Sequence, residues 1–195
     1  VYSGLLGRLA SVFYPTFQMP ARRNCKRKRG DPPRPRVTKE RGIKVHTQLD
    51  LWRKSHTLPK DPLARQIAES LLSRHIKLVA CEVVICDAAS GVATAIDAIG
   101  EDLLGRSVVL EFKTGYQRST RGQEALRNLL GNRVPSTPIN HATLQLAMTK
   151  AILEENYRVY PHQYLLMISN GKGVEVRTLP TWSCCVSTSD LKIQK

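Results

Sequence analysis

Three charged residues stand inside strongly apolar stretches of this sequence. Asp97 lies within the run 92–99, Glu111 lies near the end of the run 107–112, and Lys113 directly follows that run. Residues two apart on a β-strand share a face, so Glu111 and Lys113 point one way and Phe112 the other. If the two runs pair as a hairpin, Asp97 meets Glu111. Two carboxylates and a lysine would then converge at one end of a sheet.

These residue types suit the chemistry of a divalent cation. An unpaired charge is costly to bury, and Mg2+ takes carboxylate oxygens together with substrate phosphate. A lysine beside the metal can orient or activate the attacking water and stabilise developing charge. A plain salt bridge of Lys113 with Asp97 or Glu111 explains the same residues, and on these three alone neither interpretation is favoured.

Further polar residues surround this group in the sequence. Glu82 lies on the preceding apolar stretch, Cys81-Glu82-Val83-Val84. Gly42 and His46 occur upstream in Arg41-Gly42-Ile43-Lys44-Val45-His46, and Gln145 occurs downstream in His141-Ala142-Thr143-Leu144-Gln145-Leu146.

Along the sequence these elements follow one another as Gly42–His46, Glu82, Asp97, Glu111–Lys113 and Gln145. In this order they resemble the PD-(D/E)XK nuclease superfamily, and its RecB-like or lambda-exonuclease-like branch in particular. The resemblance runs from the Gly-x-x-x-His pattern to the glutamine motif. It departs from the family where Ile96, rather than Pro, precedes Asp97, and where Met148 and Thr149 stand in place of a Tyr.

The resemblance implies an α/β fold, the restriction-endonuclease-like sandwich with a central mixed β-sheet flanked by helices. It implies a Mg2+- or Mn2+-dependent deoxyribonuclease, most simply an exonuclease acting on DNA ends or single strands in replication, repair or recombination. The catalytic residues it implies are Asp97, Glu111 and Lys113. The metal ligands it implies are His46, Glu82, Asp97, Glu111 and the Phe112 carbonyl. Gln145 would contact the metal-site region or the DNA backbone.

Each flanking residue also has a simpler interpretation. His46 could be an ordinary helical histidine, Glu82 could pair with Arg74 or Lys77, and Gln145 could be part of a polar helix surface. Arg118 and Arg121 follow the Lys113 strand, where they suit phosphate contacts, although a solvated charged loop explains them nearly as well.

The order of elements is the scaffold that must position these side chains. Hydrophobic patterning and capping signals predict helices, with Asp61 capping the second and Asn140 the last. A further short helix is expected at 123–130, and the tail after Pro180 is expected to be loose. The expected helices are 39–52, 61–75 and 139–157, and the expected strands are 78–86, 92–99, 107–112, 163–169 and 173–179.

Charge divides the chain into a basic head and a nearly balanced remainder. Of the 195 residues, 1–46 hold 12 Lys/Arg against 2 Asp/Glu, and the rest hold 18 against 14. We expect a disordered, Pro-rich head over 1–37, a nuclease-like domain over 38–180 and a tail over 181–195. The head suits a nuclear import signal or a nucleic-acid-binding arm, and residues 1–20 resemble a mitochondrial presequence. The nucleus, or alternatively the mitochondrion, is expected, and no stretch is apolar enough to indicate a membrane span.

The five cysteines form no C-x-x-C pair, so a structural zinc site is not expected. Some members of the resembling branch carry a four-cysteine iron–sulfur cluster, but only Cys25, Cys184 and Cys185 are expected outside the core, so no cluster is expected either. Cys81 and Cys86 are expected in the core.

Two other function classes remain open. A catalytically inactive module of this fold would grip nucleic acid with its basic head and arginines, and a structural protein would use the same basic head to pack nucleic acid. Metal dependence separates both from a nuclease.

Overall fold

The computed structural model describes residues 3–4, 39–114, 137–169 and 172–191, and eight of its elements match the predicted order. The predicted helix at 123–130, Arg118 and Arg121 lie outside these ranges, as does the head apart from Ser3–Gly4. The helices are α2 (Lys39–Ser55), α3 (Pro62–Ser73) and α4 (Pro138–Asn156). The strands are β1 (Ser3–Gly4), β2 (Lys77–Asp87), β3 (Val92–Glu101), β4 (Ser107–Thr114), β5 (Gln163–Ser169) and β6 (Val174–Thr178).

The described strands form one six-stranded mixed sheet. β2, β3 and β4 follow one another as antiparallel hairpins, and β5 and β6 form another antiparallel pair. β4 and β5 run parallel, and α4 lies between them in the sequence. β1 adds two residues in parallel to the start of β3. The predicted turns at 88–91 and 101–105 are therefore confirmed as the hairpin connections.

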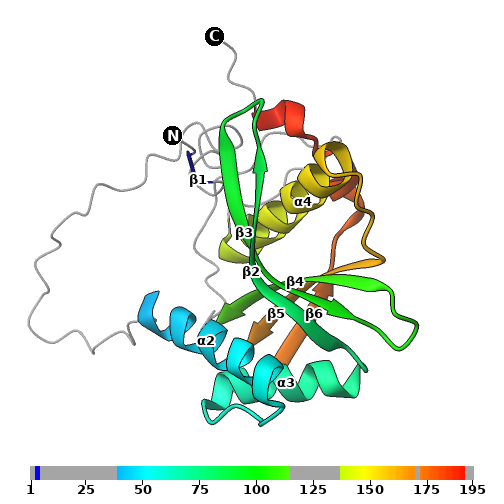
Figure 1. Cartoon of the computed structure of the whole chain (residues 1–195). Coiled ribbons are helices and arrows are strands. Elements are labelled where there is room, and N and C mark those ends of the chain that lie inside the picture. Colours follow the sequence, from blue (N-terminus) through cyan, green and yellow to red (C-terminus); the bar gives the residue numbers. More distant parts are fainter. Residues whose placement is uncertain (1–2, 5–38, 115–136, 170–171, 192–195) are drawn as a thin grey trace, which may run out of the picture.

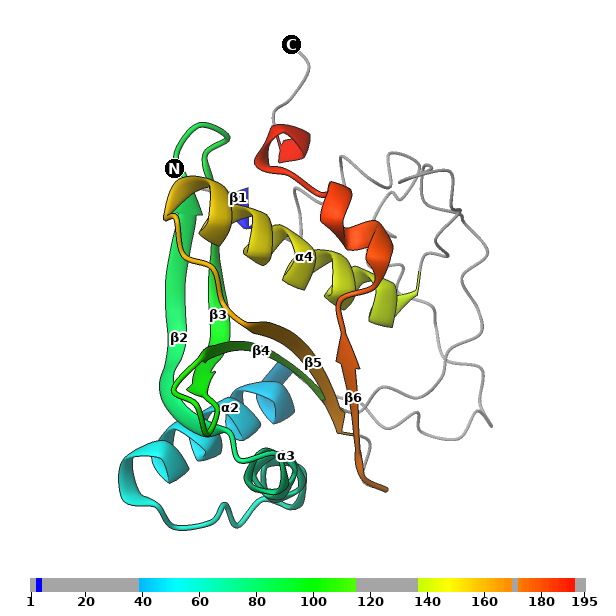
Figure 2. The same cartoon turned by 90° about the vertical axis from the view of Figure 1, so that its right-hand side faces the viewer.

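Helices cover both faces of this sheet, so the chain is an α/β sandwich (Figures 1 and 2). α4 packs on one face over a core that includes Leu144, Met148 and Ile152. α2 and α3 pack on the other face over a core that includes Leu49 and Ile67. The central mixed sheet with flanking helices agrees with the architecture expected from the sequence.

Two helix starts show how local chemistry sets the boundaries. Asp61 accepts hydrogen bonds from the backbone N–H groups of Leu63 and Ala64, which confirms the predicted cap of α3. The predicted cap of α4 was wrong, because Thr137 rather than Asn140 caps it. Thr137 has extended backbone and its Oγ1 accepts the Asn140 N–H at 3.2 Å, so the helix begins one residue earlier than expected.

Three further expectations were wrong. The apolar spacing of the sequence predicts that Leu72 shares one face of α3 with Leu63, Ile67 and Leu71. Leu72 is instead 51 % exposed, because it lies away from the row that the other three form. Cys86 is only half-buried, and Cys81, although it packs against the core under α2 and α3, is half-buried as well. Residues after Pro180 form two 3-10 helices, 181–185 and 188–191, and Val186 between them is buried in the α4 core. That burial holds the segment in place.

None of the described helices combines the length and apolar character needed to cross a membrane. Gly100 on β3 lies close to Ile76 and the start of β2. A Cβ there would lie 2.7 Å from Ile76 Cγ2 and 3.0 Å from the Lys77 carbonyl oxygen. Only glycine therefore fits at this position without a shift of β2.

Candidate metal and catalytic site

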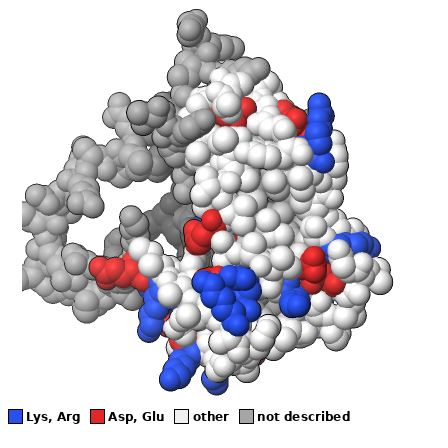
Figure 3. Space-filling view, viewed as in Figure 1, with Lys and Arg blue, Asp and Glu red and all other residues white. Residues whose placement is uncertain are grey.

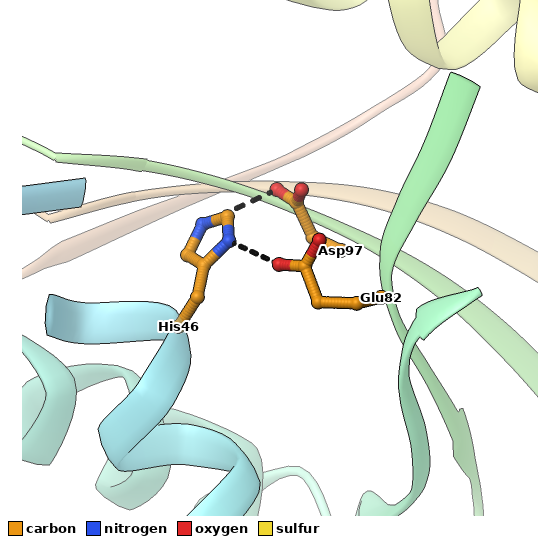
Figure 4. Close-up of side chains that lie close together, drawn as sticks. All are labelled: His46, Glu82 and Asp97. Atoms are coloured by element: carbon orange, nitrogen blue, oxygen red, sulfur yellow. Dashed lines mark hydrogen bonds and ion pairs between the residues drawn. The ribbon is translucent and has the colours of Figure 1, made fainter. Parts of the chain in front are cut away.

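His46 reaches from α2 to two carboxylates of the sheet. Its Nδ1 lies 2.7 Å from Glu82 Oε1, and its Nε2 lies 3.7 Å from Asp97 Oδ2. Figure 4 shows the imidazole pointing from α2 between the two acids. One donor atom from each of the three residues lies within 4.8 Å of the other two. The structure thus brings together three of the predicted metal ligands from three separate elements.

Glu82 is placed by a break in the β2–β3 ladder. Cys81 pairs with Ala98 and Val83 pairs with Ile96, so Glu82 lies opposite Asp97. Its φ of 54° is in the left-handed region, which costs a non-glycine residue on the order of 1–3 kcal/mol. Its carboxylate contacts His46, and not Arg74 or Lys77, the two cations that the simpler interpretation proposed as its partners.

Asp97 occupies the point where β3 and β4 cease to pair. The ladder ends with Ala98 opposite Leu110, and the next position in this register sets Asp97 opposite Glu111. Asp97 Oδ2 accepts a hydrogen bond from the Phe112 N–H at 2.7 Å, so this N–H bonds to a side chain and not to a carbonyl of the neighbouring strand. Burial raises the pKa of Asp97, and the nearby charge of Glu82 adds to this, although His46, Lys113 and the Phe112 N–H oppose the rise.

Glu111 is the most deeply buried acid of the group, with 2 % of its surface exposed. Burial, and then the negative charge of Asp97, raise the pKa of Glu111 to about 8, although Lys113 opposes the rise. Lys113 Nζ donates to Glu111 Oε1 and, at 3.5 Å, to Gln145 Oε1. The predicted meeting of two acids and a lysine at one end of the sheet is confirmed, and so is the ion pair that the simpler interpretation expected.

Gln145 comes from α4, on the opposite face of the sheet from His46. Its side chain is buried and contacts Lys113, so it is not part of an exposed polar helix surface. Phe112 packs on the α2 side, where its ring meets His46 edge-on at 6.0 Å between centroids. The structure gives a contact for the Phe112 N–H, and the role of its carbonyl as a ligand stays a prediction.

The donor set fits a hard divalent cation. Two carboxylates and one imidazole converge, and oxygen with some nitrogen donation suits Mn2+ as well as Mg2+. A third carboxyl, Glu111, is close enough to Asp97 for their charges to repel. A cation between them would relieve that repulsion, because opposite charge favours the ionised forms.

Sequence reasoning named all of the residues that meet here, but not every way in which they act. The left-handed backbone of Glu82 has no signal in a strand-like sequence. Asp97 can accept the Phe112 N–H because the β3–β4 ladder ends there. The periodicity of the sequence does not show where a ladder ends.

No protein-family model matches the chain, and no curated protein matches it either. A functional proposal therefore has to come from the residues of the site and their geometry.

Proposed function

We propose that this chain is a Mg2+- or Mn2+-dependent nuclease of the PD-(D/E)XK type that hydrolyses phosphodiester bonds in DNA. One observation carries the proposal. The buried acid Glu111 holds Lys113 at the end of the β3–β4 pair and lies close enough to Asp97 for their charges to interact, and Asp97 in turn lies beside His46 and Glu82. A merely structural ion pair needs one acid and one base, whereas this site gathers three acids around one lysine and one histidine.

The site would divide its work among these residues. His46, Glu82 and Asp97 would hold the cation, with Glu111 beside them. When bound, a divalent cation lowers the pKa of a coordinated water and neutralises charge on the phosphate. Asp97 is fixed in orientation by the Phe112 N–H, so its free oxygen has a defined direction.

Lys113 is the residue that would act on the reacting groups. Its ammonium group lies at the Glu111 carboxylate and within reach of Gln145, so two acceptors from different layers hold it. An ammonium group held in this way can orient an attacking water and stabilise the negative charge that develops on the phosphate. Gln145 would be a positioning residue, because it contacts Lys113.

The surface beside the site supports a polyanionic substrate. α2 carries Arg41, Lys44, Arg53 and Lys54, along with His46. Figure 3 shows most of the Lys and Arg of this face over its lower part, where α2 and α3 lie, with Asp and Glu among them, while the upper part carries few charges. Such a surface attracts phosphate backbones and steers their approach. Arg118 and Arg121 stay predicted phosphate contacts.

Exonuclease action on DNA ends or single strands is the form of the activity that we propose, by analogy with the RecB-like and lambda-exonuclease-like branch. A role in replication, repair or recombination would follow from that activity. The nucleus, or alternatively the mitochondrion, is the proposed location, and it rests on the composition of the basic head alone.

End-labelled single- and double-stranded DNA tests this proposal. The full chain should cleave with Mg2+ or Mn2+ and not with EDTA. Lys113→Ala should abolish cleavage while DNA binding is retained, and Lys150→Ala, on the C-terminal half of α4, should cleave normally. Single-nucleotide products would indicate an exonuclease, and internal fragments an endonuclease. Tight DNA binding without cleavage under any metal would refute the enzyme and leave an inactive binding module.

A further inference from the structure

A half-open groove lies at the C-terminal ends of α2 and α3, and none of the site residues lines it. Its volume is about 420 Å3. Trp52, Leu58, Leu72, Ile76, Leu78 and Leu103 supply its apolar lining. The groove therefore combines two helix ends, the start of β2 and the turn between β3 and β4.

Apolar surface continues beyond this groove. Leu72 is 51 % exposed and Leu103 is 74 % exposed. Ile76 and Leu103 also line a second hollow of about 650 Å3, which Leu104 lines as well. Large contiguous apolar surface on a soluble domain marks an interaction site rather than ordinary exposure. Two hollows that share Ile76 and Leu103 offer room for a peptide segment.

All four titratable side chains in the lining of the first groove are basic. They are Arg53, His56, His75 and Lys77. Arg53 is partly neutralised by Asp50 on its own helix. Lys77, by contrast, forms no ion pair with any residue in the described ranges. An occupant with carboxylates around an apolar anchor would complement this lining.

The two histidines sit in backbone conformations that glycine usually adopts. His56 has a φ of 58° and His75 a φ of 55°, in each case where the chain leaves a helix. A helix end of this kind normally carries glycine, since other residues are strained by about 1 kcal/mol or more. Both helix ends accept this cost, and both place a basic side chain at the same groove.

We propose that this groove docks an acidic segment of a partner protein, with an apolar side chain seated among Leu72, Ile76 and Leu103. The chain's own head is a poor occupant, because residues 5–38 contain nine Lys/Arg and one Asp. Nucleic acid is disfavoured by the mainly apolar lining, in which the one tryptophan is almost fully buried. The proposal does not depend on the nuclease activity.

A fluorescein-labelled amphipathic peptide with Leu and Phe on one face and Glu on the other is the probe. Its anisotropy should rise on titration with the full chain, and a matched peptide with Lys in place of Glu should not bind. Leu72→Ser combined with Leu103→Ser, and separately Lys77→Glu, should each weaken binding about tenfold, which is the effect of losing one strong contact. All three positions are exposed, so these variants should fold.

Val84→Ser and Lys60→Glu are the matched controls. Val84 is 72 % exposed, close to the exposure of Leu103. Neither Val84 nor Lys60 lines the groove. Both should bind the Glu peptide as the wild type does. The proposal is overturned if the Glu peptide does not bind, or binds equally to the groove variants. It is also overturned if those variants instead convert a dimer to a monomer in sedimentation, or lose DNA binding, since a second copy or nucleic acid would then be the occupant.

Discussion

Glu111 should make the metal-free protein less stable as the pH rises. Its carboxyl group is buried beside Asp97, and its pKa is raised from 4.5 to about 8. In the unfolded chain this group is ionised above about pH 4.5. In the folded protein it keeps its proton up to about pH 8. The folded state therefore binds more protons in this window, so stability is greatest below it and is lost as the pH rises through it.

The size of the effect follows from the same shift. Within the window, one such group lowers the free energy of unfolding by up to about 1.4 kcal/mol per pH unit. For a chain of this length, 1 kcal/mol corresponds to about 2–4 °C in Tm. Ionisation of Glu111 should thus lower Tm by roughly 3–5 °C per pH unit in the middle of the window.

The assay is thermal unfolding followed by circular dichroism, in EDTA, between pH 5.5 and 7.5. Glu111→Gln keeps the shape of the side chain but does not titrate. The Tm of this variant should therefore fall less steeply with pH than the Tm of the wild type, by roughly 3–5 °C per pH unit. Glu69→Gln, at an exposed position on α3, should follow the wild type. Mn2+ should raise the Tm of the wild type more at pH 7.5 than at pH 5.5. Parallel profiles for wild type and Glu111→Gln in EDTA would refute the reasoning.

Two further predictions concern the backbone. Gly100→Ala should lower the free energy of unfolding by about 1–3 kcal/mol in a denaturant titration, because its Cβ would lie 2.7 Å from Ile76 Cγ2. Gly173→Ala, where a Cβ would meet nothing within 4 Å, should cost far less, and equal losses would contradict the account of Gly100. Glu82→Gly should raise the stability of the metal-free protein by about 1 kcal/mol, because glycine tolerates a φ of 54°, yet it should weaken Mn2+ binding. A fall in stability like that of Val83→Gly would argue against strain at Glu82.

Most of the scaffold could be predicted because it is written in local patterns. Apolar β-rich runs and the hairpin turns between them located β2, β3 and β4 to within a few residues. Asp61 followed by proline marked the start of α3. The charged residues that interrupt these runs were visible for the same reason, because Asp97 and Glu111 stand out in apolar stretches that are expected to be buried.

The rest depended on contacts between distant segments. Val186 packs on α4, which periodicity in a polar tail does not reveal. The exposure of Leu72 depends on which face of α3 packs on the sheet. Glu82 adopts its left-handed backbone where it faces Asp97 across the ladder, and a strand pattern contains no sign of that break.

One claim is central to this account, namely that His46, Glu82 and Asp97 hold a divalent cation. A Mn2+ titration of the full chain followed by electron paramagnetic resonance tests it directly, because the signal of free Mn2+ falls as the ion binds. The wild type should bind Mn2+, and Asp97→Asn should weaken that binding at least about tenfold, since it removes a charged ligand. Asp50→Asn is the control, because Asp50 lies one helical turn beyond His46 and pairs with Arg53 and Lys54 rather than with the site, so this variant should bind as the wild type does. Equal binding by the wild type and Asp97→Asn would contradict the assignment of the site.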